Sequence, residues 1–479
     1  MRVLAHAFGQ RFDLPIPLWI FVVSGAAVVI LSFLLVLPRR VAADADDTSE
    51  RSEDAAYVRR TPGWLGALSV LFLAFLCWCG IVGSQNVPEN IVPTVLWLLA
   101  WIAVPLSVAL IGDWTQPVNP FLFLSRIADS PSLRRSILGD ERPLPWPRWL
   151  GWWPAVVLFF LAVLGELVFN LTVTLPENSA LALALYAGLS LLGGFFFGTG
   201  WRTRGEFWTV LFDTWGRIGY FRFGAPGRRG FAGGLDRPFS THVSRVVFVL
   251  LMLLNVNYDG LLTTPQWGND VERQLPGSWG RPGIHLESFR TVTFVLMVIV
   301  MLWLFGAFAY GSARLGRHGT RFLGSLSGLL PSLVPIAFGY LFAHNIEYIL
   351  INSQLMAPLI GNPPGLDSWP IHPPYPFNDS YEVNRTFLPS SFYWYAAVVV
   401  IIAVHVIAVV LAHRHLQRRA AAAEVERVSE LPWLVAMVGY TMLSLWLLAQ
   451  PLIKETASTS GSPAPAVPGI SHSVGNPPA

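Results

Sequence analysis

The sequence predicts an all-α, polytopic transmembrane helical bundle of about ten spans, and three observations support this fold class. The composition is strongly apolar, with 53% hydrophobic residues, only 13% charged residues and a mean hydropathy of +0.51. Soluble domains carry roughly 25% charged residues. Ten apolar segments are long enough to cross a bilayer as helices, which takes about 20 residues each. The basic residues are concentrated in every second connection between these segments.

The predicted spans follow one another along a single transmembrane domain, residues 1–455. They cover residues 15–37, 65–84, 92–112, 153–174, 179–199, 243–262, 290–311, 323–349, 391–412 and 432–450. Residues 456–479 are rich in Ser, Pro and Gly, a composition that predicts a disordered tail.

The distribution of arginine predicts the orientation of the chain. Alternate connections hold 24 of the 32 basic residues: 38–63, 113–150, 200–241, 311–322 and 413–431. The intervening connections, 85–91, 175–178, 263–288 and 352–390, contain only Arg273, Arg281 and Arg385. Because cationic loops resist translocation, we expect the basic connections in the cytoplasm and both termini outside it. This topology fits a multi-pass protein of a bacterial plasma membrane. The expected partners are membrane lipids, and the formal charge of +3 indicates no nucleic-acid partner.

One cytoplasmic connection contains an amphipathic pattern. Its apolar stripe has the spacing of one helix face: Trp208, Leu211, Phe212 and Trp215. The polar residues fall mostly on the opposite face: Glu206, Thr209, Asp213 and Arg217. This pattern predicts an interfacial helix that anchors the loop or senses lipids. The long outer connections 263–288 and 352–390 could cap the bundle or form a lid over a site.

Ionisable residues inside apolar spans are costly to bury, so they are the candidate site residues. Glu166, Asp259, His344 and Glu347 fall in the outer halves of three different spans. His344 and Glu347 are three residues apart and share a helix face. They could supply two ligands to a divalent metal, or a base and the group that orients it. Asp259 or Glu166 could complete the catalytic set. A polar network between helices and a proton path are the alternatives.

Two further histidines lie in the ninth span. His405 is deeper in the membrane and is either a third metal ligand, with His344 and Glu347, or a partner in a helix–helix hydrogen bond. His413 falls in AHRHLQRR at the cytoplasmic end of the span. We expect it to be an interfacial cation that alanine could replace at little cost. His344 is therefore expected to matter more for function.

Several stretches resemble a group of actinobacterial multi-pass membrane proteins labelled fenitrothion hydrolase. They are AHAFGQRFDLPIPLWIF, GDWTQPVNPF, NVNYDGLLTTPQW, SLVPIAFGYLFAHNIEYIL and WYAAVVVIIAVHVIAVVLAHRHL, spread over residues 1–416. The most specific matches are Ala343 with His344, then His405 and His413. The chain departs from the group by reading AHNIEY where an aromatic residue often follows the histidine. The resemblance implies hydrolysis of organophosphate-like or other hydrophobic esters by a metal-bound hydroxide.

Three classes of function thus remain open. An enzyme would use the outer polar residues to activate water against a hydrophobic small molecule. A transporter would need polar groups that continue from the outer cluster into the inner half of the membrane. An assembly component would bind a partner through its Pro- and Trp-rich outer loops.

Overall fold

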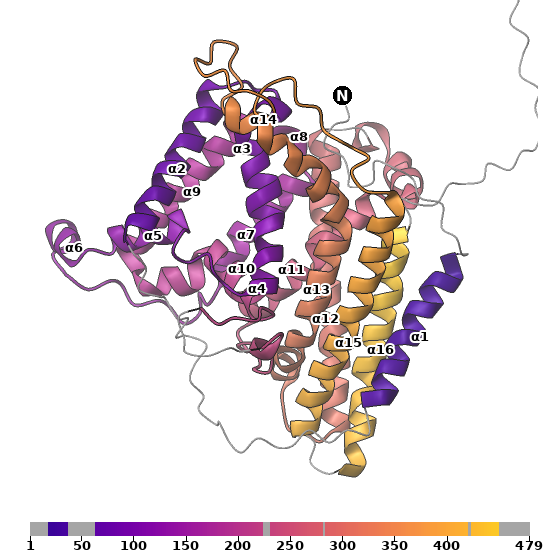
Figure 1. Cartoon of the computed structure of the whole chain (residues 1–479). Helices are drawn as coiled ribbons and strands as arrows, with labels where there is room; N and C mark the ends of the chain where they lie inside the picture. Colours follow the sequence, from indigo (N-terminus) through magenta and orange to yellow (C-terminus); the bar gives the residue numbers. More distant parts are fainter. Residues whose placement is uncertain (1–17, 37–62, 224–229, 281–282, 420–422, 450–479) are drawn as a thin grey trace, which may run out of the picture.

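The computed structural model describes residues 18–36, 63–223, 230–280, 283–419 and 423–449. Within these ranges the chain is helical and forms no β-strand (Figure 1). The α-helices are α1 (Leu18–Val36), α2 (Gly63–Val82), α3 (Ile91–Pro93), α4 (Val104–Ile111), α5 (Pro120–Ala128), α6 (Pro131–Leu138), α7 (Trp153–Leu167), α8 (Asn170–Val173), α9 (Pro176–Phe197), α10 (Phe207–Gly216), α11 (Val243–Leu262), α12 (Ile284–Leu315), α13 (Phe322–Asn352), α14 (Met356–Gly361), α15 (Ser390–Arg419) and α16 (Ala423–Ala449). The predicted tail, 456–479, lies outside the described residues.

In the part of the chain that the structure describes, eight helical segments are long and apolar enough to cross a membrane, which agrees with the predicted membrane protein. They are Gly63–Val82, Ile91–Ile111, Pro176–Phe197, Val243–Leu262, Ile284–Leu315, Phe322–Gly361, Ser390–Arg418 and Val428–Leu447. The other two predicted spans correspond to shorter apolar helices, Val22–Phe33 and Trp153–Leu167. The 15 residues of α7 rise about 22 Å, less than the roughly 30 Å of a hydrocarbon core. The count of ten spans is therefore not confirmed.

The segment Ile91–Ile111 contains an irregular helix. Residues Thr94–Ala103 form π-helical turns between α3 and α4. Pro105 lies two residues after these turns and has no N–H to donate to the carbonyl four residues earlier. The wider turns place Trp101 toward α7, where it contributes to the candidate site below.

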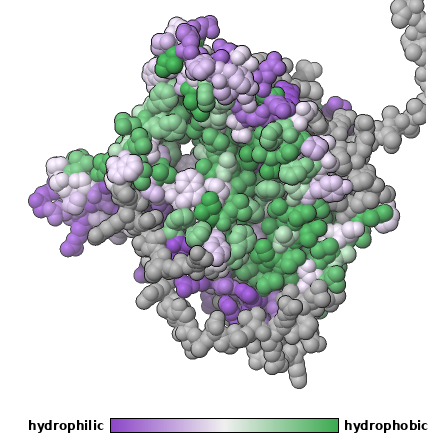
Figure 2. Space-filling view, viewed as in Figure 1, coloured by the Kyte–Doolittle hydropathy of each residue, from purple (hydrophilic) through white to green (hydrophobic). Residues whose placement is uncertain are grey.

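Loops that the sequence places on the same side of the membrane lie at the same end of the bundle. At one end, the amides of Ser84 and Ile91 donate to the carbonyls of Pro364 and Pro363, at 2.8 and 3.0 Å. The short helices α3, α8 and α14 also lie there (top of Figure 1). At the other end, the amide of Phe239 donates to the carbonyl of Ser327 at 3.2 Å. We call these the outer and inner ends, following the orientation that the arginines predict. Figure 2 shows a hydrophobic belt between more hydrophilic ends.

Helix α13 is the central helix of the bundle. In the segment Phe322–Gly361, 94% of the apolar stretch is buried inside the protein. In Gly63–Val82 the buried share of the apolar stretch is 28%. Pro331 lies inside α13 and cannot donate to the carbonyl of Ser327. That carbonyl instead accepts from Phe239, so the proline creates the site at which the inner loop is attached to α13.

Two glycines of α13 fix its alignment with the antiparallel helix α15. A Cβ atom on Gly339 would lie 2.4 Å from the side chain of Val404, and one on Gly328 would lie 2.3 Å from the ring of His415. The two contacts are eleven residues apart on both helices. Because the spacing is the same on both helices, the depth of a residue on α13 can be compared with that of a residue on α15, at about 1.5 Å per residue.

The predicted interfacial helix forms, but the structure does not confirm that it lies on a membrane surface. In α10, the stripe of Trp208, Leu211, Phe212 and Trp215 is buried against other helices, including α4 and α7. The side chain of Trp208 meets the edge of Trp101 with ring centroids 5.8 Å apart. Thr209, predicted for the polar face, is buried as well. Aromatic side chains at this spacing suit a protein core as well as a headgroup layer, which is why the pattern was ambiguous.

Candidate functional site

The central pair of the candidate site comes from α11 and α13, which pack side by side. Atom Nε2 of His344 lies 2.7 Å from Oδ2 of Asp259. This is the distance of a charge-assisted hydrogen bond. The side chains are only 10% and 20% exposed. Both residues lie in the outer thirds of long apolar helices, where a polar side chain without a partner would be costly.

Glu166 joins this pair from the last turn of α7. The indole N–H of Trp101 donates to its Oε2, and its carboxylate is close enough to Asp259 for electrostatic repulsion. It also acts electrostatically on Tyr348 of α13. Three of the predicted catalytic residues, Glu166, Asp259 and His344, are thus brought together. We call these three side chains the outer cluster.

The outer cluster holds two carboxyl groups and one imidazole in a largely buried environment. A protonated imidazole can neutralise one carboxylate, which here is the hydrogen-bonded Asp259. A negative charge on Glu166 would lie close to the negative charge of Asp259, and the cluster holds no second cation to neutralise it. Like charges at short range disfavour each other. The arrangement therefore suits a group that takes up and releases protons.

The predicted partner Glu347 takes a different place. It lies three residues beyond His344 and is buried. The imidazole of His344, however, bonds to Asp259 and not to Glu347. The carboxylate of Glu347 instead acts electrostatically on Tyr393 of α15. Sharing a helix face was therefore not enough to pair the two residues, because a neighbouring helix offered a better-placed acceptor.

The predicted metal ligands do not meet in one ligand set. His405 lies beside Val404, which packs on Gly339 of α13, so it is about five residues, or about 8 Å, deeper than His344. Its Nδ1 is 2.7 Å from the carbonyl oxygen of Ile401. Across the described parts of the chain, no group of three or more His, Cys, Asp and Glu side chains is placed to hold a metal ion.

Polar side chains continue from the outer cluster into the middle of the bundle. The amide of Asn257 on α11 donates to the hydroxyl of Tyr440 on α16. The ring of Tyr340 on α13 lies 6.4 Å from that of Tyr440. Sequence reasoning missed both tyrosines, because tyrosine in an apolar span is usually a packing residue, and only the helix arrangement brings these together.

A second histidine–carboxylate pair lies at the inner end. Atom Nδ1 of His413 is 2.8 Å from Oε1 of Glu430, and the two side chains are 1% and 0% exposed. The expectation that His413 is an interfacial cation was therefore wrong. Helix α15 continues to Arg419, and α16 begins at Ala423, so the two helices form a close antiparallel hairpin that buries both groups. Glu430, an acid at the start of an apolar run, was the signal that sequence reasoning missed.

Glu206 is a third buried carboxylate, and its surroundings indicate a structural role. It caps the N-terminus of α10 and accepts from the backbone amides of Trp208 and Thr209 at 3.1 and 2.7 Å. The hydroxyl of Tyr186 and the amide of Asn119 donate to it at 2.5 and 3.1 Å. A carboxylate with this many donors at a helix N-terminus is fully satisfied.

Outside the spans, Asp113 at the inner end has an unusual ionisation. Burial raises its pKa to about 6, although the hydrogen bond from the Thr115 hydroxyl opposes this shift, and the nearby carboxylate of Asp213 adds to it. The Thr115 hydroxyl donates to Asp113 at 2.7 Å.

Comparison with known proteins adds no assignment: no protein family, no curated protein and no solved structure matches the chain.

Proposed function

We propose that this integral membrane protein is a proton-coupled transporter in which the outer cluster binds the coupled proton. The observation that carries the proposal is the buried His344–Asp259 pair, at 2.7 Å, with the Glu166 carboxyl beside it. Imidazole is the side chain whose charge changes most readily near neutral pH. Ionisable groups that face the inside of a membrane bundle are typical of proton relays in transporters.

The second pair supports this proposal over a purely outer site. His413 and Glu430 place a histidine and a carboxyl at the inner end of the same helices. Asn257, Tyr340 and Tyr440 add polar groups at intermediate depth. A transporter needs such groups in both halves of the membrane, whereas an enzyme with an outward-facing site does not.

Proteoliposomes test the proposal. Purified protein is reconstituted with a pH-sensitive dye inside, an inward proton gradient is imposed, and small solutes are screened for accelerated acidification. We expect His344→Gln and Asp259→Asn to abolish the acceleration that the wild type shows. Glu177→Gln, which neutralises an exposed carboxylate at the outer end, is the matched control. Solute-driven acidification that is as fast in the two cluster variants as in the control contradicts the proposal.

Infrared difference spectra provide a measurement that needs no substrate. A pH change should shift carboxyl bands in the wild type, and Glu166→Gln or Asp259→Asn should remove part of this signal. The spectrum of Glu177→Gln should lose only the contribution of an exposed carboxylate.

The second candidate function is hydrolysis of hydrophobic esters, including organophosphate-like ones. One specific observation favours it: the Asp259 carboxylate holds the imidazole of His344, as an orienting acid holds a general base. The resemblance to the proteins labelled fenitrothion hydrolase points the same way. In this candidate His344 would take a proton from water, with its imidazole held by the Asp259 carboxylate.

Product release from a hydrophobic phosphotriester and a carboxylic ester, with the protein in lipid nanodiscs, tests this candidate. Loss of the general base should lower the rate by roughly 100-fold or more, so His344→Gln should be nearly inactive while Glu177→Gln retains the wild-type rate. Equal rates in the two variants would remove His344 from the reaction.

A further inference from the structure

Three buried polar atoms at intermediate depth have no hydrogen-bond partner among the described residues. They are Oδ1 of Asn257, the hydroxyl of Tyr340 and Nε2 of His405. The three side chains belong to α11, α13 and α15, and their residues are 4%, 3% and 1% exposed. Polar atoms within a bilayer cannot form hydrogen bonds with bulk water, so their hydrogen-bond partners must lie inside the protein. Buried water commonly supplies such partners, making two to four hydrogen bonds per molecule.

The alignment of α13 with α15 places these atoms between the two histidine–carboxylate pairs. Tyr340 lies four residues inward of His344, about 6 Å along the axis. Gly339 packs on Val404, so His405 lies at nearly the same depth as Tyr340. His413 follows eight residues further inward, about 12 Å. The unsatisfied atoms thus occupy the interval that separates the outer pair from the inner pair.

The hydrogen bond of His405 identifies which of its nitrogens is available. Nδ1 lies 2.7 Å from the carbonyl oxygen of Ile401, and a carbonyl oxygen can only accept. In the neutral ring Nδ1 therefore carries the hydrogen, and Nε2 keeps its lone pair. Nε2 can receive a proton from a water molecule and return it to another, while the bond from Nδ1 to Ile401 is unchanged.

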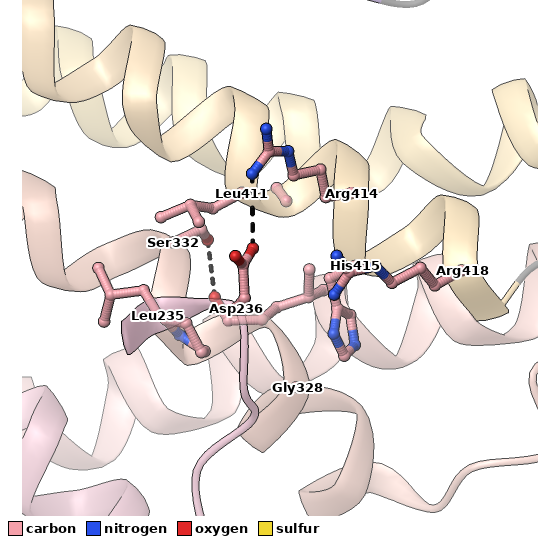
Figure 3. Close-up of a pocket in the computed structure, with 11 residues that line it drawn as sticks. Leu235, Asp236, Gly328, Ser332, Leu411, Arg414, His415 and Arg418 are labelled. Carbon is pink, nitrogen blue, oxygen red and sulfur yellow. Dashed lines mark hydrogen bonds and ion pairs between the residues drawn. The ribbon is translucent and has the colours of Figure 1, made fainter. Parts of the chain in front are cut away.

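A pocket opens at the inner end, close to the depth of His413. It is small and is lined by residues of α13, α15 and the inner loop that precedes α11. Figure 3 shows the Asp236 carboxylate directed toward Arg414, at 3.6 Å. Ser332 lines the same pocket, and its hydroxyl accepts from the indole of Trp433 at 3.1 Å. Trp433 is three residues from Glu430 on α16, so the pocket reaches the neighbourhood of the inner pair.

We propose that bound water connects the outer pair, through Asn257, Tyr340 and His405, to this inner pocket, and that protons cross the bundle along it. This proposal rests on the proposed transport function and specifies its route. His405 acts as the proton-accepting station, and Tyr340 and Asn257 hold the adjacent water. The inner pair and the Asp236-containing pocket form the exit on the opposite side.

Hydroxyl-radical footprinting of the full-length protein in nanodiscs tests whether the route is hydrated. Radicals formed from bound water label the side chains that contact this water. We expect labelling of Tyr340 and His405. Tyr258 is the internal control, because it is equally buried but its hydroxyl is satisfied by the carbonyl of Arg290 at 2.7 Å. Protection of Tyr340 and His405 to the level of Tyr258 would overturn the proposal.

Proton movement in proteoliposomes tests whether the route conducts. His405→Leu and Tyr340→Phe should slow proton movement by roughly 100-fold, the scale of losing a proton-transfer group, and Tyr258→Phe should not. If the two residues had a purely structural role, proton movement would not slow. Replacing an unsatisfied buried polar group by an apolar one leaves the fold as stable or more stable. Unchanged proton movement in His405→Leu overturns the route. If Tyr340 and His405 are labelled but the wild-type protein moves no protons, the transport function is refuted. The conclusion that water occupies the route would still hold.

Discussion

Removing one partner of the His413–Glu430 pair should destabilise the protein. His413→Ala leaves the carboxyl of Glu430 in a fully buried position, and breaking a buried pair from one side typically costs about 3–5 kcal/mol. We expect a clear drop in the thermal unfolding temperature of the purified variant. Replacing both residues by leucine should restore most of the loss, since well-packed apolar residues can substitute for a buried pair. A His413→Ala protein as stable as the wild type would show that the pair contributes nothing.

The raised pKa of Asp113 predicts a pH dependence of stability. The carboxyl has a pKa of about 6 in the folded protein and 3.8 as its ordinary value. Between these values the folded state holds a proton that the unfolded chain has released, so stability falls as the pH rises through this window. Asp113→Asn should flatten this part of the profile. Unfolding temperatures measured from pH 4 to pH 7 for both proteins check this, and parallel profiles would contradict it.

At this scale, the sequence could predict only those site residues that are unusual within their own span. Glu166, Asp259 and His344 are ionisable groups in apolar runs, so they could be found one by one. His413 and Glu430 each lie near a span end, where a charged residue is ordinary, and only the hairpin of α15 and α16 buries them. The His344–Asp259 bond could not be predicted either, because helix neighbours cannot be deduced from a single sequence.

Among the elements, the α13–α15 contact should be the most sensitive to small changes in volume. Gly339→Ala places a methyl group 2.4 Å from Val404, which forces the two helices apart and should lower the unfolding temperature. Gly188→Ala on α9 meets nothing within 4 Å and should be neutral or stabilising, since alanine favours a helix by about 1 kcal/mol over glycine. Equal effects of the two substitutions would show that the close approach is not needed.

Apolar length and periodicity predicted where most helices lie, but not their surroundings. The stripe of α10 and its helical structure were both foreseen, and the helix nonetheless lies among α4 and α7. In α7 the helix is shorter than the predicted span, because the apolar run breaks after Leu167 into the short α8. This break follows directly after Glu166, so the irregularity and the candidate site coincide.

For the whole molecule, the arginine distribution makes a prediction about sidedness. Two exposed positions report on opposite ends: Arg135 within α6 and Tyr375 in the long outer loop. In intact bacterial cells, a membrane-impermeant thiol reagent should modify Tyr375→Cys. It should reach Arg135→Cys only after permeabilisation. The reverse pattern would invert the orientation and would exchange the outer and inner roles of the two histidine–carboxylate pairs.

The two glycine contacts between α13 and α15 also limit how the protein can move. Contacts eleven residues apart span about 16 Å, and at both of them the backbone of α13 touches a side chain of α15 without a spare atom between them. Sliding or rotation of one helix against the other would produce clashes at both points. Any alternation between outward-open and inward-open states must therefore carry these two helices as one rigid unit, with the rearrangement at its borders with α11 and α12.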